Sequence, residues 1–67
     1  MNKKMLLSIM ALNGDTLASL SKVLNVSVST LSCKINEQGT EFKQGEIVKI
    51  KNHYNLTPEQ VDAIFFA

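Results

Sequence analysis

The chain is poor in the residues that interrupt or cross-link a fold. Its 67 residues include one proline, three glycines and one cysteine. The scarcity of proline and glycine favours short helices over a β-sandwich or barrel, whose many turns use these residues. The single cysteine, Cys33, excludes an internal disulfide, and a free thiol fits the reducing cytoplasm. We therefore expect a mainly helical, intracellular protein.

Long apolar runs are also missing. No stretch approaches the ~20 apolar residues that a membrane-spanning helix needs. The basic start at residues 1–4 and the apolar run 5–12 are followed by Asn13 and Gly14, not by the small-residue cleavage site of an export signal. We expect a soluble, cytoplasmic protein that does not engage the membrane. Hydrophobic residues still make up 45% of the chain, so residues 1–67 are predicted to form one compact domain.

Patterns that carry catalysis or ligand binding are lacking too. The sequence has no glycine-rich phosphate loop, no pair of ligands at metal spacing and no nucleophile with a base nearby. Only one histidine, His53, could join Cys33, so a zinc site is not expected. We predict that the protein is not an enzyme and that it takes no cofactor and no small-molecule ligand.

Charge is distributed unevenly along the chain. The net charge is +1, but residues 1–36 carry four lysines against one aspartate, whereas residues 37–67 carry three lysines against five acidic residues. This dipolar distribution suits a molecule that turns its N-terminal half toward an anion.

Apolar periodicity predicts five short helices. Residues 3–12 place Leu6, Ile9 and Met10 on one face, and Asn13-Gly14 ends this helix. Either Asp15 or Thr16 can cap a second helix, in which leucines recur on one face up to residue 24. A fourth helix is expected over roughly 44–54. The last begins at Thr57-Pro58-Glu59-Gln60, which combines an N-cap, a proline at the first position and a capping-box glutamine.

The third helix is the most informative. Asn25 tolerates the left-handed conformation of a tight turn, and Ser27 is a good N-cap for a helix that runs to about Asn36. Leu31 and Ile35 lie one turn apart and are expected to face inward. The remaining positions are expected to be exposed; they are Ser29, Thr30, Ser32, Cys33 and Lys34. Two helices joined by a tight turn form a helix-turn-helix unit, whose second helix lies in the major groove of DNA. The predicted fold is an all-α, five-helix bundle with a central helix-turn-helix.

Two further expectations concern the C-terminal half. Glu46, Lys49 and Lys51 are predicted to form an ordinary exposed face. Phe66 lies off the apolar stripe of the last helix, so that it either closes the core or contributes to a dimer contact.

Three segments of the chain resemble a known family. They are Thr16-Leu17-x-x-Leu20-Ser21-x-x-Leu24-Asn25-Val26-Ser27-x-Ser29-Thr30-Leu31-Ser32-x-Lys34-Ile35-Asn36, Glu41-Phe42-Lys43-Gln44-x-Glu46-Ile47 and Ile64-Phe65-Phe66. Together they are similar to the DNA-binding domains of the phage Cro and repressor family, with a lambda-repressor-like fold. The resemblance covers essentially the whole chain. It implies a transcriptional regulator of phage, prophage or mobile-element origin that binds double-stranded operator DNA, as a possible homodimer.

The resemblance also implies which residues meet DNA. The helix over 28–36 would enter the major groove and contact base edges through Val28, Ser29, Ser32 and Cys33. The DNA backbone would be contacted from three places: the start of the second helix, the third helix and the start of the fourth. These backbone contacts would be made by Thr16, Ser27, Thr30, Lys34, Thr40, Lys43 and Gln44.

Some positions depart from the family pattern. Leu17 stands where the family usually has glutamine, Ser21 where it has alanine, and Asn25 where it has glycine. Leu17 lacks a hydrogen-bonding group that the family often directs at DNA, and Val28 and Cys33 make the base-contacting face apolar. We therefore expect modest affinity and a short or degenerate site. The same apolar face leaves a second interpretation open, a helical module that docks on a host regulator without binding DNA.

Overall fold

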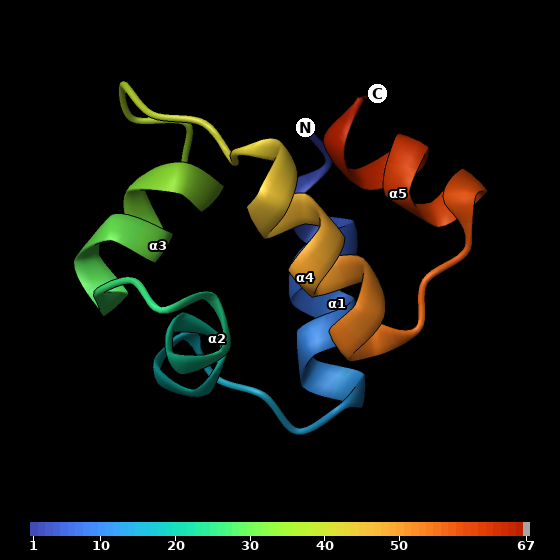
Figure 1. Cartoon of the computed structure of the whole chain (residues 1–67), viewed down its shortest axis with the longest axis horizontal. Coiled ribbons are helices and arrows are strands. Elements are labelled where there is room, and N and C mark those ends of the chain that lie inside the picture. The colour runs from blue at the N-terminus through green and yellow to red at the C-terminus, as the bar shows by residue number, and fades with distance from the viewer. Residues whose placement is uncertain (67) are drawn as a thin grey trace.

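The structure is a computed structural model that describes residues 1–66, and these residues form five helices around one core (Figure 1). The helices are α1 (Lys3–Leu12), α2 (Leu17–Leu24), α3 (Val28–Ile35), α4 (Gln44–Tyr54) and α5 (Pro58–Phe65). Residues 1–66 contain no strand. The all-α, five-helix architecture predicted from the sequence is confirmed, with α3 and α5 on opposite sides of α4 and α1 (Figure 1).

Side-chain caps set the beginnings of the helices. Thr16 caps α2, because its hydroxyl accepts a 3.2 Å hydrogen bond from the Ser19 N–H. The other candidate for this cap, Asp15, instead accepts a bond from the Ser19 hydroxyl. Ser27 caps α3 through the Thr30 N–H, and Thr57 and Gln60 form the predicted capping box at the start of α5. Each cap satisfies N–H groups that have no partner within the helix.

The turn between α2 and α3 depends on a left-handed residue. Asn25 has φ 57° and ψ 44°, the conformation expected for it from the sequence. The chain reverses within residues 25–27, and the Val26 N–H donates a 3.0 Å bond to the Ser21 carbonyl. The two helices pack against each other across this turn. Residues 17–35 therefore form a helix-turn-helix in the structural sense.

A single apolar cluster holds the helices together. Each helix contributes to it, and its fully buried members are Leu6, Leu20, Leu31, Ile50 and Ile64. Phe42 lies in the loop before α4, and its ring packs edge to face on Phe65, with centroids 5.4 Å apart. Ser21 is also buried, and its hydroxyl donates to the Ala18 carbonyl at 2.7 Å. The serine hydroxyl is thus hydrogen-bonded inside the domain.

Two expectations for the C-terminal half need correction. Glu46 was expected on an exposed face, but its side chain is mostly buried and paired with Lys34. Phe66 is 68% exposed, so the alternative in which it closes the core is wrong. Phe66 is the C-cap residue of α5, and the residues that this helix buries are Val61 and Ile64.

None of the helices in residues 1–66 combines the length and the apolar character that a membrane crossing requires.

Candidate nucleic-acid interface

The outward face of α3 carries the residues expected to contact bases. Leu31 and Ile35 turn into the core, and this fixes the rotation of the eight-residue helix. Ser29 lies on the opposite side and is exposed, and Val28, the first residue of the helix, is 44% exposed. Ser32 and Cys33 follow them one turn later and are half-buried. Helical spacing therefore brings the four residues to one face, with the N-terminal pair standing furthest out.

The hydroxyl groups near this face have defined roles. Ser27 accepts from the Thr30 N–H at 3.1 Å and donates to the Thr30 hydroxyl at 2.9 Å, so its O–H donor is used within the helix cap. Thr30 is exposed and keeps its own O–H as a donor. Thr16 is likewise exposed, and its hydroxyl, which accepts from Ser19, can still donate outward. Thr16 and Thr30 are thus better placed than Ser27 to bond to a phosphate.

The third predicted group lies at the start of α4. Lys43 and Gln44 are exposed, whereas Thr40 is half-buried in the preceding loop. The Lys43 N–H is bonded to Glu46 Oε1 at 2.8 Å, so that the Glu46 side chain caps this helix from its third position. Because α4 packs against α2, and α2 packs against α3, the start of α4 has a defined place relative to the helix-turn-helix.

Lys34 departs from the expectation. It was predicted on the surface as a contact to the DNA backbone, but it is only 4% exposed. Its ammonium lies 3.0 Å from Glu46 Oε1 and donates to the Glu41 carbonyl, also at 3.0 Å. Lys34 falls on the buried side of α3, next to Leu31 and Ile35, and its long aliphatic stem packs there while the charge finds a partner. Lys34 is therefore not available at the surface for a contact with the DNA backbone.

The ion pair perturbs the Glu46 carboxyl. Burial raises the pKa of Glu46, but the hydrogen bond from the Lys43 N–H and the charge of Lys34 outweigh burial and lower it overall. Glu46 is therefore ionised at neutral pH.

A second polar cluster, which the sequence analysis did not identify, ties α2 to α4. Asp15 Oδ2 lies 2.9 Å from His53 Nε2 and accepts a 2.7 Å bond from the Tyr54 hydroxyl. Asp15 Oδ1 accepts a bond from the Ser19 hydroxyl. These bonds lower the pKa of Asp15 from 3.8 to about 2, with that from Ser19 contributing most. The available signal was weak: an acidic residue just before an N-cap, with its partners 38 and 39 residues away.

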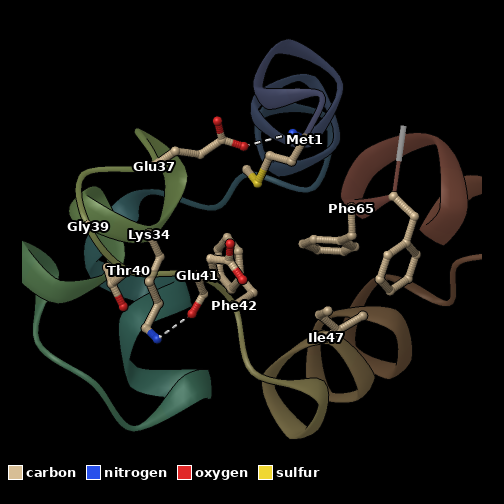
Figure 2. Close-up of a pocket in the computed structure, with 10 residues that line it drawn as sticks. Met1, Lys34, Glu37, Gly39, Thr40, Glu41, Phe42, Ile47 and Phe65 are labelled. Atoms are coloured by element: carbon tan, nitrogen blue, oxygen red, sulfur yellow. Dashed lines mark hydrogen bonds and ion pairs between the residues drawn. The ribbon is translucent and has the colours of Figure 1, made fainter.

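A hollow of about 680 Å³ lies behind the start of α4, between the 37–42 loop, α4 and α5 (Figure 2). Its walls combine the aromatic side chains of Phe42, Phe65 and Phe66 with the polar loop residues. Figure 2 shows the Lys34 side chain running along this loop to the carbonyl of Glu41. Among the described residues, every buried side-chain nitrogen and oxygen has a hydrogen-bond partner.

The chain was compared with protein-family models, with curated proteins and with solved structures, and none of the three comparisons gave a match.

Proposed function

We propose that this protein is a sequence-specific, DNA-binding transcriptional regulator of the Cro/repressor type, of the kind that phages, prophages and mobile elements encode. Its α3 helix enters the major groove of an operator, where Val28 meets a thymine methyl group and Ser29 bonds to a base edge. The observation that carries this proposal is the division of α3 into two faces. One face anchors the helix in the core, and the other presents small side chains, which permit close approach to another surface.

Three segments meet the DNA backbone in this proposal. Thr16 at the start of α2 and Lys43 and Gln44 at the start of α4 bind phosphates on either side of the groove, and Thr30 binds beside α3. The N–H groups of the first turn of a helix favour an anion at such a position. With Lys34 inside the domain, Lys43 is the charged side chain of this set. The affinity for DNA therefore depends mainly on uncharged hydrogen-bond donors, those of Thr16, Thr30 and Gln44.

The operator is bound by two copies of the chain. Val48, which is 48% exposed, and Phe66 line one groove between α4 and α5 together with Lys51. Asp62 is exposed one turn before Phe66, so α5 presents an acidic and apolar edge while α4 presents a basic and apolar one. A two-fold axis would place the α4 edge of one copy on the α5 edge of the other, with Lys51 opposite Asp62. The pairing of Lys51 with Asp62 thus favours a second copy of this chain as the partner that covers this groove.

Selection of duplexes from a randomised DNA pool, at near-physiological salt, tests the proposal. An enriched motif is expected, and an inverted repeat would give the spacing of the two half-sites. Binding should weaken as salt rises, with a slope of log K against log salt of about −0.9 for each phosphate neutralised.

The competing interpretation, a module that docks on a protein, predicts a different outcome. A folded protein with no enriched motif and no salt-sensitive DNA binding would contradict the proposal, since contacts between apolar surfaces do not weaken in this way.

A further inference from the structure

Lys34 carries its charge into the interior of the domain. Among residues 1–66 it is the charged residue with the least exposed surface, 4%, and the side chain of its partner Glu46 is 12% exposed. Burial of a cation is unfavourable unless the cation is paired and hydrogen-bonded. Both conditions are met, by the Glu46 carboxylate and the Glu41 carbonyl at 3.0 Å each.

The partners of Lys34 lie at two points of one segment. Glu41 precedes Lys43 and Gln44, and Glu46 follows them. The same oxygen of Glu46 that meets Lys34 also accepts the Lys43 N–H at 2.8 Å. One ammonium on the last turn of α3 therefore connects that helix to both sides of the segment that is proposed to bind phosphate.

We propose that Lys34 is a positioning residue for DNA binding, which holds the start of α4 at a fixed place beside α3 without touching DNA itself. This inference rests on the proposed function. The base contacts of α3 and the phosphate contact at the start of α4 must form at the same time. A change in the distance between α3 and the start of α4 therefore weakens both contacts.

Two other roles for Lys34 make different predictions. If Lys34 bound a phosphate directly, Glu46 would oppose DNA binding, because its carboxylate would repel the backbone. If the pair served stability alone, an apolar pair of similar volume would replace it without loss of affinity, since such exchanges are often neutral or stabilising. Only the positioning role predicts that removal of Glu46 weakens DNA binding while the domain stays fully folded.

The test compares Glu46→Leu, Lys34→Met and the double variant with the wild type. Each is titrated with the duplex that the wild type selects, at a temperature where circular dichroism shows it fully folded. We expect each single variant and the double variant to bind about tenfold more weakly. We also expect the losses not to add, because either change breaks the same connection. Where a single variant does not fold, the double variant carries the test, because it leaves no unpaired buried charge and keeps the net charge.

Glu41→Gln is the matched control. It removes an exposed carboxylate from the same segment but leaves the carbonyl that Lys34 contacts, so binding should stay equal or become slightly tighter. Wild-type affinity in the double variant, or tighter binding by Glu46→Leu, would overturn the positioning role while the proposed function stands. If the wild type itself binds no duplex, the proposed function fails, and the positioning role fails with it.

Discussion

The hydroxyl of Tyr54, the last residue of α4, donates a 2.7 Å hydrogen bond to Asp15, which immediately precedes the N-cap of α2. His53 approaches the same carboxylate oxygen at 2.9 Å. The bonds join two helix ends that are 39 residues apart in sequence. They fix the start of α2, where Thr16 is proposed to meet a phosphate, against the end of α4.

Tyr54→Phe should weaken this connection without changing the packing of the ring. We expect the melting temperature at pH 7 to fall by about 5 °C, as for the loss of one hydrogen bond in a small domain. In the Asp15→Asn background the same substitution should have a smaller effect, because the charged acceptor is gone. An unchanged melting temperature for Tyr54→Phe would show that the bond contributes nothing to stability.

The acid sensitivity of the fold should reflect Asp15. Its pKa falls from 3.8 to about 2 on folding, so the folded state binds this proton less readily than the unfolded chain. The stabilisation is present above pH 4 and is lost as the pH falls toward 2. Thermal melts across this range should show a shallower decline for Asp15→Asn than for the wild type. Equal declines would mean that Asp15 is not the responsible group.

Leu31→Ala tests the orientation of α3. Leu31 is fully buried, and its truncation should destabilise the domain by about 2–5 kcal/mol. Leu12→Ala is the control, because Leu12 is 86% exposed and its truncation should change stability by less than about 0.5 kcal/mol. Urea unfolding followed by circular dichroism measures both. Similar effects of the two substitutions would contradict the assignment of the buried face.

Ser29→Glu tests the outward face of the same helix. The side chain is exposed, so the fold should be retained, while the new carboxylate would meet the negative charge of DNA and abolish operator binding. Ser8→Glu makes the same change at an exposed position of α1 and should bind normally. Fluorescence anisotropy with the selected duplex gives both affinities. Normal binding by Ser29→Glu would place the DNA-contacting surface elsewhere.

Phe66→Ser tests the proposed contact between two copies. Because Phe66 is mostly exposed, its removal should leave the melting temperature of the monomer nearly unchanged. Sedimentation with a two-site operator duplex should show that the wild type binds as a pair of copies, whereas the variant binds each half-site independently as a single copy. Leu12→Ser removes an exposed apolar side chain from α1 and serves as the control. Cooperative binding by Phe66→Ser would rule out the groove between α4 and α5 as the interface.

The helices could be predicted from the sequence because their signals are local. Thr57-Pro58-Glu59-Gln60 and Ser27 mark helix starts through bonds to residues three positions away, and Asn25 marks a turn through its own backbone preference. The outward face of α3 followed from Leu31 and Ile35 in the same way. Helical spacing alone was enough to separate the two faces.

The polar contacts between distant segments could not be predicted. Nothing local distinguishes Lys34 from an exposed lysine, since its burial depends on where Glu41 and Glu46 lie in space. Asp15 likewise looked like a candidate N-cap, and only the fold brings Tyr54 and His53 to it. The expected exposure of Lys34 was wrong for this reason.

The division of α3 into two faces has an evolutionary consequence. Val28 and Ser29 contribute little to the core, so substitutions there change what the helix contacts at little cost in stability. Under the proposed function, lineages of this protein can diverge in operator preference while inheriting an unaltered scaffold. New specificities are then reachable by single mutations, without compensating changes elsewhere in the chain.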